Sequence, residues 1–481
     1  MQREELLELV KNIKKLKSED NFIEIKSAHD GCPTKLYDTI SAFSNQNEGG
    51  KIIFGVSEKG NYEVVGVYDA KQLIEKVKNV CKEMEPIVKG IFTEANLGDK
   101  TIVSLEVPGV DVLERPVFYR GEGIANGSYI RIGDADLKMS QAEIYGDQAF
   151  KKRIKDDKRV VEDVDDKNID KDKIHEYLKK VKSERPNLNA NVSNEEILEL
   201  MGIKNSGKYT LTGVLIFAKY PQAYFPQFSI TAVAVNGYEL GDMDDDGARF
   251  IDNKRITGNV EEMLDQALEF VKRNSKVKTI IDEQGKRVDR VEYPIKAIRE
   301  AVLNSIVHRD YSIHTEGTPV AIEMYTDRIE IKNPGGLYGN ISVEQLGKSM
   351  PDTRNEILAN ALEIMGVTEN RYSGIPTINK ELKNNGLDNA VFKSENGSFS
   401  IIIYNSKRST RNNSKIKGKE IEKQLLEYLR TPRTRDEIIS FTGLSKYYTI
   451  NIILKGMIED GKVALTIPDV PKSSKQKFYA V

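Results

Sequence analysis

The chain has 481 residues, of which 72 are lysine or arginine and 74 are aspartate or glutamate, so its formal net charge is −2. This near balance excludes a uniformly basic nucleic-acid-binding protein, and any polyanion must be bound by local patches. Hydrophobic residues make up 39% and charged residues 30%, which excludes a disordered chain and indicates several domains with their own cores.

The cysteine content and the absence of long apolar stretches indicate a compartment. Cys32 and Cys81 are too few for a disulfide scaffold and favour a reducing, cytoplasmic environment. The sequence contains neither a signal-peptide pattern nor an apolar run long enough to span a membrane. We therefore expect no membrane partner.

Residues 1–150 mix helical and strand periodicities, which predicts an α/β domain. The glycine-rich segment GEGIANG (121–127) lacks the strand-then-helix context of a phosphate-binding loop and predicts a hairpin turn. Helices are predicted at 4–16, about 37–45 and 71–84, and strands at 22–28, within 49–67, at 101–110 and at 127–139.

Residues 151–290 predict a helical linker followed by an α/β connecting region. The mixed-charge run 151–173 indicates a solvated helix or linker. Asp242, Asp244 and Asp246 copy the start of a calcium-binding loop, but Asn253 stands where the closing glutamate is needed, so we expect an exposed acidic loop. Helices are predicted at 173–201 and 259–274, and buried strands at 208–217 and 227–236.

Three further segments complete an α+β multidomain fold. Residues 291–404 predict a second α/β unit, with helices at 294–309 and 342–365 and strands within 319–332 and 389–404. Residues 405–419 form a basic linker without a single acid. Residues 420–481 follow the order helix, helix, turn, helix and strand pair, which is typical of a winged helix.

Acids gather around one lysine in the first domain. Glu19 and Glu24 precede Lys26, and Glu58 follows the strand IIFGV. Carboxylates at the ends of neighbouring strands can hold a divalent ion that activates water, and a lysine can neutralise a phosphate. The alternative is an ordinary salt-bridged strand edge, with Glu24 paired to Lys26.

A polar stripe also lies on the predicted helix 294–309. Glu300, Asn304 and His308 are spaced four residues apart and therefore share one helix face. Such a stripe is either a partly exposed surface or the wall of a site. A site would suit nucleotide chemistry, with Asn304 as a Mg²⁺ ligand and Glu300 as a base toward water.

Four stretches in order resemble the Alba-type core domain of the Schlafen family: EDNFIEIKSA (19–28), LYDTISAFSNQNEGGKIIFGVSEKG (36–60), VVGV (64–67) and RPVFYRGEGIANGSYIRIG (115–133). The resemblance implies nucleic-acid binding. In some members it implies metal-dependent cleavage of tRNA-like RNA, with Glu19, Glu24 and Glu58 as the acidic triad, Lys26 beside it and Mg²⁺ or Mn²⁺ as the ion. Glu58 stands where an aspartate is common.

Basic and aromatic residues of this domain could follow a nucleic-acid path, because guanidinium groups hold phosphates and aromatic rings stack on bases. The alternative is that the tyrosines are ordinary strand residues. The candidates are Arg115, Tyr119, Arg120, Tyr129 and Arg131.

Residues 173–404 resemble the C-terminal module of RecG-like proteins, which is similar to GHKL-type ATPase domains of the gyrase and histidine-kinase kind. No Walker A sequence is present. The resemblance implies ATP binding, with Glu300 as base and Asn304 on the metal. Asn333 replaces the adenine-recognising aspartate and Tyr372 replaces a glycine of the second glycine box. The glycines that match are Gly335, Gly336 and Gly374.

In the C-terminal module the helix that begins near residue 445 is the candidate recognition helix. The residues expected to reach DNA are Lys446, Tyr447, Tyr448 and Lys455. The alternative is a winged helix used for dimerisation or protein contacts.

The leading hypothesis is a cytoplasmic protein that binds nucleic acid and ATP and cleaves tRNA-like RNA in stress or phage defence. The alternative is a non-enzymatic DNA-binding transcriptional regulator with ATP as a conformational ligand. A third hypothesis is an ATP-driven clamp that closes by dimerisation, which agrees with the homo-oligomer that we expect.

Overall fold

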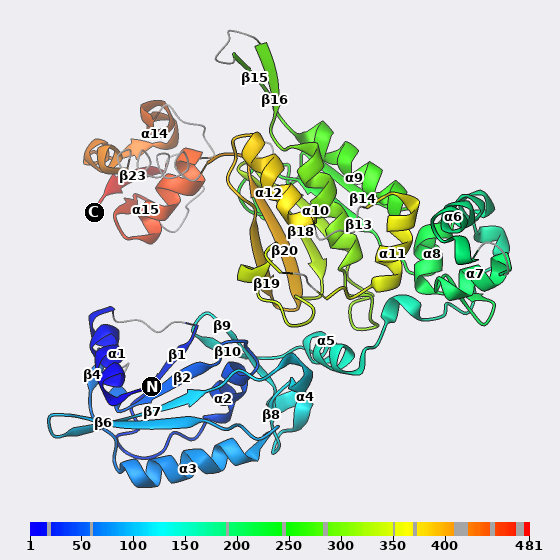
Figure 1. Cartoon of the computed structure of the whole chain (residues 1–481). Helices are drawn as coiled ribbons and strands as arrows, with labels where there is room; N and C mark the ends of the chain where they lie inside the picture. The colour runs from blue at the N-terminus through cyan, green and yellow to red at the C-terminus, as the bar shows by residue number, and fades with distance from the viewer. Residues whose placement is uncertain are drawn as a thin grey trace.

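The computed structural model describes residues 1–16, 21–57, 61–188, 192–242, 247–281, 287–349, 352–368, 373–407, 422–442, 448–467 and 476–481. These residues form an N-terminal unit (to residue 152), a central unit (153–407) and a small C-terminal unit (from 422), which are separate bodies in Figure 1. The predicted α+β multidomain fold is confirmed.

The N-terminal unit is built on a four-stranded sheet with the order β1 (Ile23–Lys26), β2 (Gly50–Phe54), β7 (Lys100–Val107) and β6 (Ile91–Leu97). Only β1 and β2 run parallel. Alternate strand residues face opposite sides. Ile52 and Phe54 therefore pack with α2 (Tyr37–Ser44) and α3 (Ala70–Glu83), and Ile53 packs with α1 (Arg3–Leu16).

Short elements surround this sheet. The segment expected to be a hairpin turn at 121–127 is instead the short helix α4 (Gly123–Gly127), so that prediction was wrong. The remaining strands form three ladders: β3 (Val56–Ser57) with β4 (Glu63–Val64), β5 (Met84–Glu85) with β8 (Phe118–Tyr119), and β9 (Tyr129–Ile132) with β10 (Ala135–Lys138).

Helix α5 (Gln141–Lys152) ends the N-terminal unit and leads into the central one. It begins with a capping box between Ser140 and Glu143 and ends at Arg153, which adopts the left-handed conformation with φ of 52°. Within the N-terminal unit, α5 packs against α4 and the 3-10 turn Val112–Glu114. These contacts attach α5 to the N-terminal unit.

A helical subregion follows, with α6 (Lys171–Glu184), α7 (Asn194–Leu200) and α8 (Leu211–Phe217). The buried strand predicted at 208–217 was wrong. Only Lys208–Tyr209 is a strand (β12), paired with β11 (Lys204–Asn205), and Thr210 then caps α8 by accepting the amide of Gly213. All residues of α8 are buried, so its sequence shows no amphipathic period.

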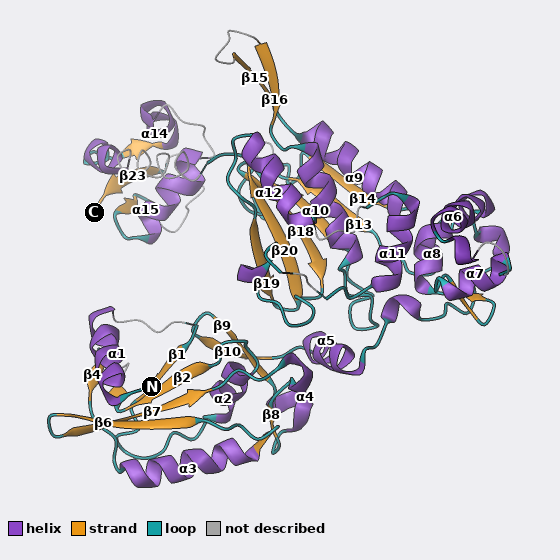
Figure 2. Ribbon diagram, in the orientation of Figure 1, coloured by secondary structure: helices purple, strands orange, loops and turns teal. Residues whose placement is uncertain are grey.

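The central sheet has six strands in the order β14 (Asp252–Ile256), β13 (Ile230–Ala234), β17 (Val320–Met324), β18 (Arg328–Pro334), β20 (Ser398–Tyr404) and β19 (Val391–Glu395). Four helices pack on it (Figure 2): α9 (Val260–Asn274), α10 (Ile295–Val307), α11 (Glu356–Met365) and α12 (Gly374–Asn384). Strands β13 and β17 are parallel neighbours, and the other pairs are antiparallel.

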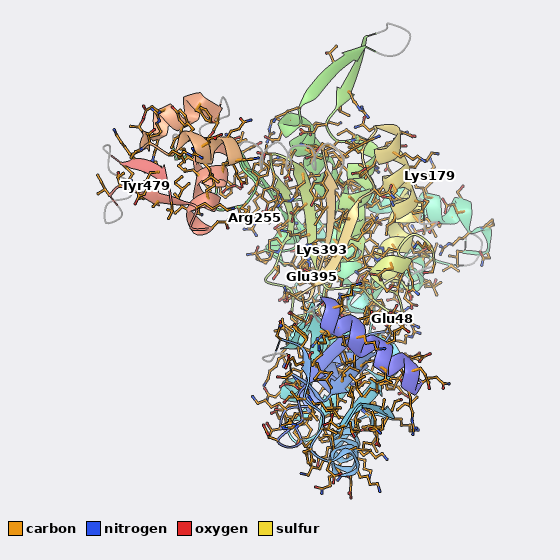
Figure 3. All side chains as sticks on the ribbon, turned by 90° about the vertical axis from the view of Figure 1, so that its left-hand side faces the viewer. Glu48, Lys179, Arg255, Lys393, Glu395 and Tyr479 are labelled. Carbon is orange, nitrogen blue, oxygen red and sulfur yellow. The ribbon has the colours of Figure 1, made fainter. Side chains whose placement is uncertain are left out.

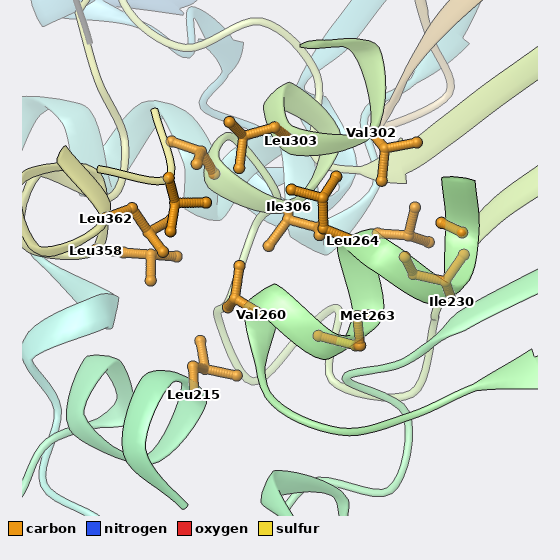
Figure 4. Packing of buried hydrophobic residues seen from close by; sticks show 14 of the residues in the cluster. Leu215, Ile230, Val260, Met263, Leu264, Val302, Leu303, Ile306, Leu358 and Leu362 are labelled. Carbon is orange, nitrogen blue, oxygen red and sulfur yellow. The ribbon is translucent and has the colours of Figure 1, made fainter. Parts of the chain in front are cut away.

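One hydrophobic core joins this sheet to the preceding helices. Figure 4 shows Leu215 of α8, Ile230 of β13, Val260 of α9 and Ile306 of α10 packed in the same cluster. The expected domain border at 290/291 therefore cuts through a single unit. Strand β13 pairs with β17, which begins at Val320, and local sequence patterns do not show that two strands so far apart share a sheet.

Two smaller parts complete the description. The hairpin of β15 (Val277–Ile281) and β16 (Arg287–Val291) projects from the central unit (Figure 1). The C-terminal unit contains a helix at 422–428, α14 (Arg435–Thr442), a π-helix at Tyr448–Leu454 and α15 (Lys455–Glu459). Its sheet has the order β21 (Arg433–Thr434), β23 (Lys477–Ala480) and β22 (Val463–Leu465).

In the part of the chain that the structure describes, every helix is too short or too polar to cross a membrane.

Candidate functional site

A cavity of about 410 Å³ lies in the central unit, beside α10. Its walls come from α10, the end of β18, the loop that follows β18 and the beginning of α12. All seven residues that the sequence assigned to nucleotide binding line it: Glu300, Asn304, His308, Asn333, Gly335, Gly336 and Gly374. Residues that are up to 74 positions apart in the sequence are thus brought to one place.

Helix α10 places its polar stripe on the cavity because its opposite face is apolar. Ala297, Ile298 and Val302 are buried in the core, whereas Glu300 and Asn304 are partly exposed. The helix ends at His308, whose amide donates to the carbonyl of Asn304 at 2.9 Å. The stripe therefore forms a wall of the cavity.

Glycines keep this cavity open. A Cβ atom built on Gly374 would lie 2.9 Å from Nδ2 of Asn304 and 3.4 Å from the Oε2 atom of Glu300. Gly335 has φ of +93°, and its Cβ atom would lie 2.2 Å from Nη1 of Arg354. Side chains at either position would fill the space next to the polar stripe or strain the backbone.

Asn333 lies near the end of β18 and lines the cavity. Its side chain is buried, with 3% of the residue exposed, and its amide nitrogen donates to the Pro334 carbonyl at 3.3 Å. An amide offers both a donor and an acceptor, so it can bind the edge of a base without carrying a charge.

His308 is held neutral. Desolvation in the cavity wall lowers its pKa to about 4, and the charge of Arg354 acts in the same direction. At neutral pH the ring therefore offers hydrogen bonds and no positive charge.

Sequence reasoning missed Arg354 and Asp310, which lie behind the glycines. Arg354 donates from Nη2 to the carbonyl of Gly336 at 3.2 Å, and its Nη1 lies 3.5 Å from Oδ2 of Asp310. The Asp310 amide in turn donates to the Pro334 carbonyl at 2.8 Å. Because these contacts join segments that are far apart in the sequence, no local spacing could have revealed them.

The acidic cluster of the N-terminal unit is described only in part, since Glu19 and Glu58 lie outside the described residues. The buried Glu24 carboxylate contacts Lys26 through Oε1 and lies 2.8 Å from Nη1 of Arg131 through Oε2. Among the described residues, no group of three or more histidine, cysteine, aspartate or glutamate side chains is arranged to hold a metal. Glu24 is therefore ion-paired in this structure, as the salt-bridge alternative expects.

Arg131 is the centre of that network. Its side chain is 0% exposed and pairs with Asp136 at 2.9 Å as well as with Glu24. Burial acts to lower its pKa, but the hydrogen bonds and charges of Asp136 and Glu24 outweigh burial and raise it. The structure places Arg131 inside the unit, where it cannot touch a surface-bound nucleic acid.

The other candidates for a nucleic-acid path differ in exposure. Tyr119 stacks on Tyr37 with ring centroids 4.5 Å apart, and Tyr37 was not predicted from the sequence. Tyr129 is buried and meets Tyr37 edge-on. Arg120 is half exposed, with its Nε 3.1 Å from Glu85.

Arg115 is directed inward. It donates from Nη2 to Oδ1 of Asn47 at 2.8 Å and from Nε to the Val110 carbonyl at 3.1 Å. Desolvation by burial lowers its pKa, and the charges of Asp147 and Asp111 act against that shift. Arg115 therefore braces two loops of the N-terminal unit.

In the C-terminal unit the predicted DNA contacts are only partly described. Lys446 and Tyr447 lie outside the described residues, and for Tyr448 only the backbone is described, at the start of the π-helix. Lys455 begins α15 and is exposed.

Three segments of the chain match known protein families. Residues 19–140 match the family described as "Schlafen, AlbA_2", and residues 317–403 match "Putative ATP-dependent DNA helicase recG C-terminal". Residues 143–231, which run from within α5 through α8 to the start of β13, match a domain of unknown function. A search of curated proteins found no match.

Two solved structures are similar in part. The DIP2311 protein from Corynebacterium diphtheriae is 16% identical, with 94% of this chain and 93% of that chain covered and a TM-score of 0.40. The N-terminal domain of a "Putative ATP-dependent DNA Helicase RecG-related Protein" from Nitrosomonas europaea is 24% identical, with 28% and 93% covered and a TM-score of 0.23. The chain thus contains one segment that matches the Schlafen AlbA_2 family and another that matches the RecG C-terminal family.

Proposed function

We propose that the chain is a nucleic-acid-binding protein that binds ATP in the cavity of its central unit. The observation that carries the proposal is that seven residues assigned to a nucleotide from separate motifs line one cavity. The description of the family matched by residues 317–403, "Putative ATP-dependent DNA helicase recG C-terminal", supports ATP binding, and the Schlafen match supports nucleic-acid binding.

The residues present fit ATP and a divalent ion. The volume of about 410 Å³ lies within the range of small-molecule sites. Gly335, Gly336 and Gly374 leave room for phosphates close to the backbone, and Asn333 can bind the base. Asn304 provides an oxygen donor of the kind that Mg²⁺ accepts, and Glu300 lies on the same helix face as a candidate base.

Within this site, Glu300 would accept a proton from an attacking water, while Mg²⁺ would neutralise the charge of the phosphates. The neutral ring of His308 would form hydrogen bonds with the nucleotide without adding a positive charge to the cavity. Asn333 would select the base by hydrogen bonding.

Nucleic acid would bind on the N-terminal unit, with a contribution from the C-terminal unit as a winged helix. The stacked Tyr37 and Tyr119, the half-exposed Arg120 and the exposed Lys138 provide aromatic and cationic contacts on one unit. In the C-terminal unit, Lys455 at the start of α15 is a described cation among the residues expected to reach DNA.

Calorimetric titration of the full-length chain with ATP and Mg²⁺ tests the nucleotide site. We expect binding by the wild type and a weaker affinity for Asn304→Ala, since the substitution removes an oxygen donor from the cavity wall. Absent binding, or equal affinity of both proteins, would overturn the proposed site.

Fluorescence anisotropy with labelled tRNA and labelled duplex DNA tests the second part. The slope of log Kd against log salt reports the number of phosphates contacted. Deleting 405–481 should weaken binding if the C-terminal unit contributes. An unchanged Kd would remove that unit from the nucleic-acid interface.

A further inference from the structure

A second hollow lies between the N-terminal and central units. This interdomain cleft has a volume of about 340 Å³. Its lining includes Asn47 and Glu48 on one side and Ser342 and Glu395 on the other. Glu48 and Glu395 are labelled in Figure 3, near the junction of the two bodies.

One strip of backbone forms a wall of both hollows. Residues Gly335–Tyr338 and Ile341 line the interdomain cleft and the nucleotide cavity. The strip directly follows β18, and it contains Gly335 in the left-handed region, with Gly339 at φ of +82° just beyond. A movement of this strip that alters the shape of the nucleotide cavity would therefore also alter the shape of the interdomain cleft.

The strip contacts α5, which belongs to the N-terminal unit. The ring of Phe150 meets the ring of Tyr338 edge-on, with centroids 5.1 Å apart and planes at 89°. The guanidinium of Arg153 lies 4.7 Å from the Phe150 centroid, and its Nη1 lies 3.7 Å from Oδ1 of Asp352. Asp352 itself lines the nucleotide cavity.

Arg354 contacts two residues of the strip. It donates to the Gly336 carbonyl while its guanidinium lies 5.1 Å from the Tyr338 ring centroid. Its side chain is 10% exposed, and its Nε and Nη1 atoms make no hydrogen bond. Arg354 therefore links the strip, through the Gly336 carbonyl and the Tyr338 ring, to Asp310.

We propose that ATP in the cavity is coupled to the N-terminal unit through the strip Gly335–Tyr338 and the contact of Tyr338 with Phe150. The nucleotide would shift the strip, the strip would shift α5, and the nucleic-acid affinity of the N-terminal unit would change. This rests on the proposed function, since it takes the cavity to bind ATP. By thermodynamic linkage, nucleic acid must change the ATP affinity by the same factor.

Hydrogen exchange of the full-length chain, with and without ATP and Mg²⁺, tests the coupling without any nucleic acid. We expect ATP to change the exchange of residues 141–152, which lie outside the nucleotide cavity. In parallel, anisotropy should show that ATP shifts the Kd for labelled tRNA by about fivefold or more.

Phe150→Leu removes the ring contact and keeps an apolar side chain of similar size. It should retain the wild-type Kd for ATP and lose both responses. Arg153→Ala, at a side chain that is 59% exposed, should fold normally and weaken both responses. Phe92→Leu is the matched control, because Phe92 packs on the core of the same unit and does not line the cleft.

The possible results are distinct. ATP that binds the wild type without changing α5 exchange or the tRNA Kd overturns the coupling and leaves the ATP site standing. Full responses in Phe150→Leu overturn the proposed route. An absence of ATP binding overturns both this inference and the proposed function.

Discussion

The guanidinium of Arg131 lies 2.8 Å from the carboxylate of Glu24, inside the N-terminal unit. The sequence assigned these residues to different roles, one on a nucleic-acid path and one on a metal. The structure joins them in a buried ion pair that also includes Asp136. Removing one partner of such a pair leaves a charge uncompensated, so any functional test here needs a structural control.

The ribonuclease hypothesis predicts that the wild type cleaves tRNA with Mg²⁺ or Mn²⁺ and that Glu24→Gln does not. Asp136→Asn is the matched control, because it removes another carboxylate from the same guanidinium but none from the predicted acidic triad. We expect both variants to lose about 1–3 kcal/mol of stability, measured by chemical denaturation. Equal cleavage by the wild type and Glu24→Gln, or loss of cleavage in Asp136→Asn as well, would contradict the assignment.

Gly374→Ala should weaken ATP binding about tenfold, which corresponds to about 1.4 kcal/mol. The added methyl group would lie 2.9 Å from Nδ2 of Asn304 and displace it from the cavity wall. Gly456→Ala in α15 is the control, since nothing lies within 4 Å of its added Cβ. Calorimetry should show an unchanged ATP affinity for the control, and a similar result for Gly374→Ala would mean that phosphates do not approach this glycine.

Glu300→Gln should separate binding from turnover. The amide keeps the shape of the side chain but cannot accept a proton, so we expect the Kd for ATP to stay near the wild-type value. Any ATPase activity should fall about 100-fold or more. Phosphate release under steady-state conditions measures the effect, and unchanged turnover would show that Glu300 is not the base.

Asp157→Ala should destabilise the central unit by about 1–3 kcal/mol. Oδ2 of Asp157 accepts the amides of Ile357 and Leu358, at 2.8 Å and 3.2 Å, and so caps α11. Asp157→Asn retains a carbonyl oxygen and should lose less. Denaturant unfolding distinguishes the two variants, and equal losses would show that the cap contributes little.

Asp147 should make stability depend on pH. Burial raises its pKa to about 7, with the charge of Arg115 acting against the shift and Glu143 adding to it. The folded chain therefore keeps this proton over a range in which the unfolded chain has lost it, so stability falls as pH rises from about 4 to about 7. The fall from this group amounts to about 4 kcal/mol at most.

Asp147→Asn should remove that part of the pH dependence. The variant should resemble the wild type near pH 4 and be more stable than it above pH 7, because the wild type there carries a buried charge. Thermal unfolding across this range is the measurement. Parallel curves for the two proteins would show that Asp147 ionises freely in the folded chain.

Much of the fold followed from local patterns. The apolar residues of α1, including Leu6, Val10 and Ile13, recur at helical spacing and are buried, so the sequence located this helix. Helix α8 was taken for a strand because every one of its residues is buried and several are β-branched. A fully buried short helix and a fully buried strand look alike when periodicity is the only guide.

The residues that line the cavity of the central unit could be singled out from the sequence because they lie in compact motifs on or next to α10, β18 and α12. The elements that support it could not. Asn355 donates from its side-chain amide to the carbonyls of Val307 and Arg309, both at 2.7 Å, and thus joins the end of α10 to a segment more than 40 residues further along the chain. Contacts of this kind depend on tertiary packing, which leaves no local spacing in the sequence.

The parallel neighbours β13 and β17 bear on how the protein can be divided for experiments. A fragment that begins at residue 291 would lack β13, and the hydrogen-bonding edge of β17 would then face water. Exposed edges of apolar strands invite pairing with other chains. Such a fragment should aggregate on expression, whereas one that begins near residue 153 keeps the sheet and its helices together.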